Sequence, residues 1–194
     1  MKRHLLPLLF VAGLFAGGCA TQIKTETTQN PPPAEKFANF TRFEMPKLAL
    51  LPPYAGQEPN ERALAKIQEN VNLRMNPALQ TWNSAAPAGA PVRTLLIEAS
   101  IPEIKFINAT SRVWAGAMAG SSAVIVRVRI SEKETGKVIA EPMFYARAAA
   151  MSGAYSLGGA DNAMLVRIAN RLSDYLLANY SQAVGGVTGA EPAK

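Results

Sequence analysis

The chain has 194 residues, a formal charge of +6 and 48% hydrophobic residues, with one cysteine and one histidine. Because His4 precedes Cys19, the chain from Cys19 onwards has no imidazole and a single thiol. This composition excludes Ser-His-Asp and Cys-His nucleophilic sites, the usual zinc sites and an internal disulfide. The basic surplus is mild and spread along the chain, which argues against a nucleic-acid partner, since nucleic-acid binders gather their basic residues on one face.

The N-terminus has the pattern of a bacterial lipoprotein signal. Lys2 and Arg3 precede an apolar run over residues 5–15 and the small residues 16–18, and Cys19 follows directly. In lipoproteins such a cysteine receives a diacylglyceryl group and becomes the first residue. The apolar run is too short to span a bilayer, although Ala16 stands where an aliphatic residue such as Leu is usual. Ala20, in place of an aspartate, predicts passage to the outer membrane, facing the periplasm.

Composition then divides the chain into four parts. Residues 1–18 are the signal peptide, and residues 19–36, rich in Thr, Gln, Asn and Pro, are predicted to be a disordered tether because they bury too little apolar surface. Residues 182–194, rich in Gly and Ala, are predicted to be a disordered tail. Residues 37–181 are long enough for one folded domain.

The domain is predicted to begin with a strand over residues 48–51 and a helix capped by Asn60. Apolar residues recur in this helix at three- and four-residue steps. These residues are Leu64, Ile67, Val71, Met75 and Leu79. Pro77 is expected to break or kink the helix near Asn76.

Three further strands and a second helix follow. Residues 92–107 are extended, with Pro102 indicating a bulge or an edge position, and residues 124–131 alternate as in a half-buried strand. Residues 137–147 are expected to return as the antiparallel partner, with Pro142 again requiring a bulge or an edge. Asp161 is expected to cap the last helix. The apolar stripe of this helix comprises Leu165, Ile168, Leu172, Tyr175 and Leu176.

The order strand, helix, three strands, helix predicts an α+β fold. We expect a two-layer sandwich in which an antiparallel or mixed sheet of about four strands is covered on one face by two main helices.

Two loops rich in glycine and alanine are candidates for partner contact. Residues 108–122 contain Trp114 and Met118, and residues 151–160 contain Tyr155 and Leu157. The first loop enters a strand and the second leaves its antiparallel partner, so the loops are expected to share one rim of the sheet. Aromatic residues and methionine suit adaptable recognition. The alternative for Trp114, which we favour, is a place in the core, with Tyr155 and Leu157 exposed.

Arg127 and Arg129 are a possible contact for an anionic ligand, because they lie on the polar side of the predicted strand. The more ordinary interpretation is a solvated strand face, paired with Glu141 or another acid across the hairpin.

Residues 112–139, with the glycine- and alanine-rich loop, the strand at 123–129 and the turn at 134–137, resemble a group of uncharacterised bacterial lipoproteins. Glu132 and Gly136 occupy places comparable to an acidic residue and a glycine that flank this turn in the group. The resemblance spans residues 48–180. The architecture is also similar to periplasmic domains of lipoproteins that regulate or build envelope machines, such as curli-export and peptidoglycan-synthase-activator lipoproteins. It implies no catalytic residues.

We therefore expect a membrane-anchored, non-catalytic binding or structural module of an envelope assembly, with an envelope protein as partner and with no cofactor or metal. No phosphate loop or dinucleotide fingerprint is present. Two alternatives stay open. An enclosed apolar cavity would favour a carrier of lipid or a small ligand, and two carboxylates about 5–10 Å apart in an open cleft would favour a cell-wall hydrolase.

Overall fold

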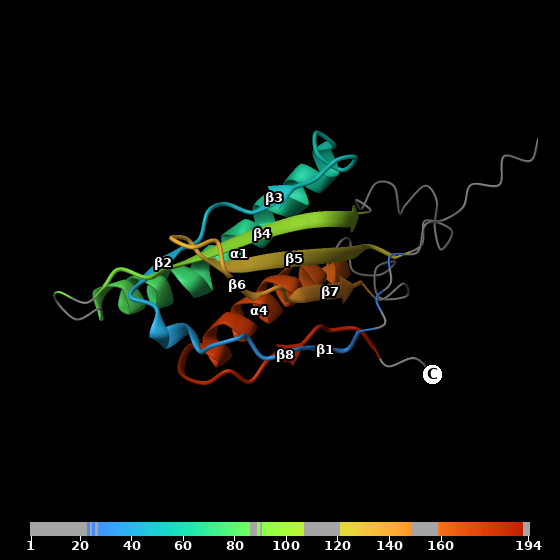
Figure 1. Ribbon diagram of the computed structural model, residues 1–194. Helices are drawn as coiled ribbons and strands as arrows, with labels where there is room; N and C mark the ends of the chain where they lie inside the picture. Colours follow the sequence, from blue (N-terminus) through green and yellow to red (C-terminus); the bar gives the residue numbers. More distant parts are fainter. Residues whose placement is uncertain are drawn as a thin grey trace, which may run out of the picture.

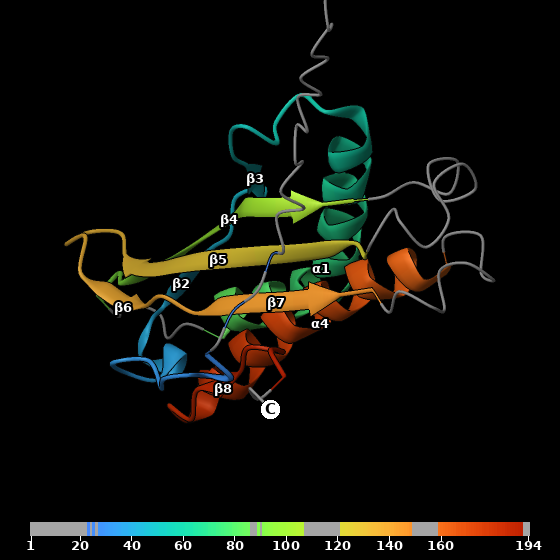
Figure 2. The same ribbon diagram turned by 90° about the vertical axis from the view of Figure 1, so that its right-hand side faces the viewer.

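The computed structural model describes residues 23, 25, 27–85, 89, 91–106, 121–148 and 159–191. In this part of the chain two long helices, α1 (Glu58–Ser84) and α4 (Gly159–Ser181), lie on one face of a mixed sheet (Figures 1 and 2). The predicted α+β class, with two main helices and a mixed sheet, is confirmed.

The centre of the sheet is an antiparallel pair, β4 (Thr94–Lys105) and β5 (Ala123–Glu132). Along β4 lie β2 (Arg42–Glu44) and β3 (Ala49–Leu50), both parallel to it. Along β5 lie β6 (Val138–Ala140) and β7 (Met143–Arg147), both antiparallel to it. Within the described residues the sheet therefore has six strands, and the prediction of about four, in the order β-α-β-β-β-α, is wrong.

Two local features explain the difference in strand number. β2 is only three residues long, too short for a periodic signal, and the strand predicted over residues 137–147 is divided into β6 and β7 at Pro142. A proline cannot donate to the ladder, although the carbonyl of Pro142 still accepts from Val128 N at 2.9 Å. The bulge predicted at Pro102 is present, since the β4–β5 register shifts between Ser100 and Glu103.

Helix α1 differs from the prediction at both ends. It begins at Glu58, with Pro59 in its first turn, so Asn60 is not its cap; the buried Asn60 amide donates to Gln57 Oε1 at 3.0 Å. The helix also continues through Pro77 to Ser84, so a break at Pro77 is wrong, whereas the kink that was the alternative stays a prediction. Pro77 lies on the exposed side of α1, where water can reach the backbone carbonyl that loses its partner, and buried Trp82 holds the last turn against the core.

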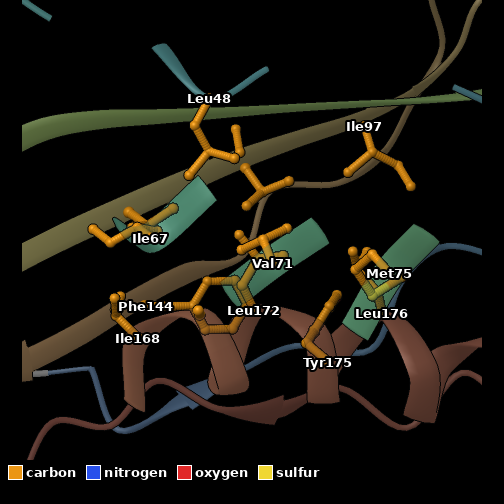
Figure 3. Packing of buried hydrophobic residues seen from close by; sticks show 14 of the residues in the cluster. Leu48, Ile67, Val71, Met75, Ile97, Phe144, Ile168, Leu172, Tyr175 and Leu176 are labelled. Carbon is orange, nitrogen blue, oxygen red and sulfur yellow. The ribbon is translucent and has the colours of Figure 1, made fainter. Parts of the chain in front are cut away.

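Helix α4 buries its predicted apolar stripe completely. Asp161 is buried in the first turn, two residues after the helix begins, and is therefore not its cap. Figure 3 shows α1 and α4 side chains meeting beneath the sheet, with Val71 and Met75 near Leu172 and Leu176. At one edge of this core the rings of Trp82 and Tyr180 stack with their centroids 4.4 Å apart. The two predicted stripes thus form one core with the inner face of the sheet.

The segments predicted to be a tether and a tail belong in part to the folded structure. Strand β1 (Gln29–Asn30) pairs antiparallel with β8 (Gly186–Val187), and the short 3-10 helix η1 (Phe37–Asn39) buries Phe37. The prediction of disorder is therefore wrong for residues 27–36 and 182–191. Polar contacts supply the order that composition did not reveal: the buried Asn179 amide accepts from Val184 N at 2.8 Å and from Gly185 N at 2.9 Å.

Candidate functional site on the outer face of the sheet

The outer face of the sheet, opposite the helices, carries Arg127 and Arg129 near the middle of β5. Both arginines are exposed, and both point to the same side because they are two positions apart on a strand. Their strand neighbours on β4 are Ser100 and Glu98, respectively. On the other side of β5, Arg127 lies opposite Met143 of β7. The candidate anion contacts are thus placed at the centre of an uncovered part of the sheet.

These arginines line a shallow, open hollow of about 560 Å³ over β3, β4, β5 and the start of β7. Its floor and walls are formed by Pro46, Lys47, Ala49, Glu98, Ala99, Ser100, Arg127, Val128, Arg129, Glu141 and Met143. The lining mixes charged and apolar groups and opens to solvent, unlike the enclosed apolar cavity of a lipid carrier.

The charged side chains of the hollow are not paired with one another. Among the described residues no ion pair involves Lys47, Glu98, Arg127, Arg129 or Glu141, although the hollow brings three cations and two carboxylates together. The alternative that Arg127 or Arg129 pairs with Glu141 is therefore not seen. Elsewhere the described charges pair readily, as in the Arg74–Asp174 bridge of 2.6 Å between α1 and α4.

This arrangement suits a partner that carries both signs of charge. A guanidinium presents a rigid fork of donors that binds a carboxylate or phosphate in two places, and carboxylates accept from ammonium and amide groups. Neighbouring strands are about 4.8 Å apart, so Glu98 on β4 and Arg129 on β5, which are opposite each other, lie one strand spacing apart. Periodicity identified Arg127 and Arg129, but Lys47 and Glu98 were missed because only the strand register brings them beside the arginines.

A second charged cluster, centred on Arg93, is structural. Arg93 binds both carboxylate oxygens of Glu35, at 3.0 and 3.1 Å, and donates from Nε to Glu132 at 2.6 Å. Its guanidinium also lies 4.4 Å from the centre of the Phe40 ring. Hydrogen bonds from Arg93 lower the pKa of Glu35 to about 2, against the desolvation that would raise it, and also lower the pKa of Glu132. Carboxyls held ionised in this way cannot serve as a general acid near neutral pH.

The rim residues Trp114, Met118, Tyr155 and Leu157 lie outside the described residues, as does Cys19. The described residues next to these loops do lie at one end of the sheet. Ala123, at the start of β5, is paired with Lys105 on one side and with Arg147 on the other, and Ala148 N donates to Ser122 O at 2.9 Å.

The described residues include no group of three His, Cys, Asp or Glu side chains placed to hold a metal ion. None of the helices resolved in these ranges is both long enough and apolar enough to cross a bilayer.

No protein-family model and no curated protein matches the chain. Solved structures with partial likeness include a predicted lipoprotein from Caulobacter crescentus CB15, at 11% identity, covering 70% of this chain and 91% of that one with a TM-score of 0.36. The hypothetical protein CT253 from Chlamydia trachomatis is 15% identical, with coverages of 72% and 94% and a TM-score of 0.41. A protein from Xanthomonas campestris of the family DUF330 is 9% identical, with coverages of 83% and 97% and a TM-score of 0.39. At these scores the resemblance to uncharacterised lipoproteins stays a prediction from the sequence.

Proposed function

We propose that this chain is a lipoprotein of the bacterial envelope that acts as a non-catalytic binding module. Cys19 carries the lipid, the domain faces the periplasm from the outer membrane, and the outer-face hollow binds a polypeptide segment of an envelope protein. The signal pattern that ends at Cys19 supports the anchoring. At least two acyl chains give stable attachment, since each buried methylene contributes about 0.8 kcal/mol.

The observation that carries the binding role is the group of five charges without ion pairs on the sheet face opposite the two described helices. Lys47, Arg127 and Arg129 stand beside Glu98 and Glu141 without forming ion pairs, whereas charges such as Arg74, Arg93 and Lys133 are paired. Side chains already paired within the protein lose those contacts when a partner binds, whereas unpaired ones lose only water. A partner that carries both signs of charge can therefore bind at the hollow without breaking an ion pair of the described structure.

Site-specific photocrosslinking in cells tests this role. A photoreactive amino acid at Ser100, on the floor of the hollow, is expected to crosslink to an envelope protein, whereas one at Leu73 is not. Leu73 is 68% exposed on α1, away from the hollow, and serves as the matched exposed control. Neutralising Arg127→Gln and Arg129→Gln together should lower the Ser100 crosslink at least about tenfold, because each lost charged hydrogen bond costs more than 1 kcal/mol.

A second pair of neutralised cations controls for net charge. Arg62→Gln with Lys66→Gln removes two exposed charges from α1 and should leave the Ser100 crosslink unchanged. Equal crosslinking from Ser100 and Leu73, or equal losses in the two double variants, would contradict binding at the hollow.

A cell-wall hydrolase is the second candidate, because Glu98 and Glu141 line the same open hollow on opposite sides of β5. Glycosidases place two carboxylates about 5–9.5 Å apart across the scissile bond. If this were the activity, purified protein would release soluble saccharides from peptidoglycan, and either Glu98→Gln or Glu141→Gln would reduce release by orders of magnitude. Absence of release by the wild-type protein would exclude this candidate.

A further inference from the structure

The N-terminal end of the described chain is fixed to one end of the sheet. The carbonyl of Ile23 accepts from the Tyr145 hydroxyl at 3.2 Å, and the Ile23 side chain packs against Ala123 and Ile125 on the outer face. Only 6% of Ile23 is exposed. The path of the chain towards Cys19 therefore begins at the end where β5 starts and β7 stops.

The remaining chain is too short to carry the domain far from its anchor. Four residue steps separate Cys19 from Ile23, and an extended chain spans at most about 3.6 Å per residue, or about 14 Å in all. The other end of β5, at Glu132, is about 30 Å further along the sheet at the rise of a strand. The lipid anchor thus keeps one particular end of the domain near the bilayer.

That end is rich in cations without carboxylate partners. Lys105 and Arg147 flank Ala123 in the sheet register and share its face, and Arg167 of α4 donates to the Arg147 carbonyl at 2.9 Å. Arg171, one turn further along α4, donates to the Tyr145 carbonyl, and none of these four cations takes part in an ion pair within the described chain.

The acids at this end include Glu58 and Glu61 in the first turn of α1 and the buried Asp161 in the first turn of α4. Glu58 is paired with Arg62, and Glu61 accepts from Gly56 N at 2.8 Å. Glu103 lies two positions before Lys105 on the same strand, and Glu191 is close enough to affect the Tyr145 hydroxyl.

The charges without an ion-pair partner at this end are therefore mainly cationic. At the opposite end most described cations are in ion pairs, as Lys133 is with Glu44 at 2.7 Å, although the exposed Lys36 is not.

We propose that this basic end, formed by Lys105, Arg147, Arg167 and Arg171 around Ile23, lies on the anionic headgroups of the membrane that holds the lipid anchor. The inference rests on the lipidation proposed for Cys19. The span to Cys19, at most about 14 Å, is short enough to let these cations come within a Debye length of the headgroups, about 8 Å at physiological salt. Each cation near an anionic surface favours contact by about fivefold. The domain therefore lies against the bilayer by one end and directs the other end away from it.

Fluorescence quenching of the mature lipoprotein in vesicles tests this orientation. A cysteine that carries an environment-sensitive dye is placed at Ala163, exposed in the first turns of α4, or at Val138, which is 40% exposed at the opposite end. Cys19 is blocked by its lipid, so only the new cysteine is labelled. In vesicles of phosphatidylglycerol and phosphatidylcholine in equal parts, headgroup quenchers should act on the dye at Ala163 and not on the dye at Val138.

Charge variants test the role of the cations. Lys105→Gln with Arg147→Gln should lower the ratio of contacting to detached domains about 25-fold, whereas Lys133→Gln with Lys137→Gln, at the opposite end, should leave it unchanged. Equal quenching at the two sites, or no effect of neutralising Lys105 and Arg147, would overturn the inference. Vesicle flotation keeps the two proposals apart: protein that fails to float with vesicles contradicts lipidation, whereas protein that floats with both dyes equally quenched contradicts only the orientation.

Discussion

The side-chain amide of Asn30 pairs with both backbone groups of Met143, 113 positions away. Asn30 Nδ2 donates to the Met143 carbonyl at 2.9 Å, and the Met143 N–H donates to Asn30 Oδ1 at 2.8 Å, as a neighbouring strand would do. The side chain of Asn83 in α1 pairs in the same way with Phe43 of β2. The Phe43 N–H donates to Asn83 Oδ1 at 2.8 Å, and Asn83 Nδ2 donates to the Phe43 carbonyl at 3.1 Å. At β7 on one edge of the sheet and at β2 on the other, an asparagine side chain thus makes the hydrogen bonds that a further strand would make.

The edge of β7 that faces away from β5 has hydrogen-bond partners along most of its length. After Asn30, Thr188 accepts from Tyr145 N at 2.8 Å, Arg171 donates to the Tyr145 carbonyl, and Arg167 donates to the Arg147 carbonyl. Unpaired strand edges invite pairing with other chains. Addition of a partner strand at β7 is therefore disfavoured, which agrees with the proposal that a partner binds the face of the sheet.

Asn30→Ala is predicted to destabilise the domain by about 2–4 kcal/mol, because it leaves the Met143 N–H and carbonyl without partners and frees β1 from β7. Urea unfolding measures the change. Asn76→Ala, on the exposed side of α1, is the matched control and should change stability by less than about 0.5 kcal/mol. Similar effects of the two substitutions would show that the Asn30 contact contributes nothing specific.

Glu35 is predicted to make stability depend on pH in the acid range. Arg93 lowers its pKa from 4.5 to about 2 in the folded protein. Because the folded pKa is below the unfolded one, the stabilisation is complete above about pH 4.5 and is lost as the pH falls towards 2. Glu35→Gln should remove about 1–2 kcal/mol at neutral pH, allowing for its partial exposure, and flatten this pH dependence.

Urea unfolding at several pH values measures the Glu35 effect. In the variant the free energy of unfolding should still decrease as the pH falls, but less steeply. The remaining dependence comes from Glu132 and Glu134, whose pKa values are also lowered. An unchanged slope in Glu35→Gln would contradict the role given to the Arg93 pair.

Lipidation predicts that Cys19 is the site of acyl transfer. Cells given a palmitate analogue should label the wild-type protein and leave Cys19→Ser unlabelled, and the variant should leave the membrane fraction. The mature chain has no other thiol, so residual label on the variant would have to lie elsewhere and would contradict the anchor.

Trp114 and Tyr155 remain the sharpest test of the predicted rim. Truncation of a buried aromatic residue costs about 3–5 kcal/mol. Trp114→Ser is therefore expected to lower the melting temperature strongly, as a core residue would, and Tyr155→Ser to leave it nearly unchanged. An unchanged melt for Trp114→Ser combined with loss of partner crosslinking would instead identify Trp114 as part of a contact surface.

Local sequence periodicity predicted the parts of the fold that depend on it. The stripe from Ile67 to Met75 and the alternation of β5 each repeat often enough to reveal a buried face. The same reasoning failed where order comes from distant polar contacts: β1 and β8 depend on Asn30, Asn179 and Thr188, whose partners cannot be read from neighbouring residues.

The candidate site was likewise predicted only in the part that depends on local sequence periodicity. Arg127 and Arg129 follow from one strand, but the hollow exists only after β3, β4 and β7 are placed beside that strand. The predicted break of α1 at Pro77 was wrong, because a proline on the exposed side of a long, well-packed helix is tolerated.

The β1–β8 pair has a practical consequence for experiments on this protein. Ala190 packs against the same small cluster as Ile23, so the two ends of the described chain emerge side by side. A reporter fused after Glu191 would start beside the proposed lipid attachment and would crowd that end of the sheet. The turn between β5 and β6, about 30 Å away along β5, is the better insertion point for an affinity tag or a fluorescent label.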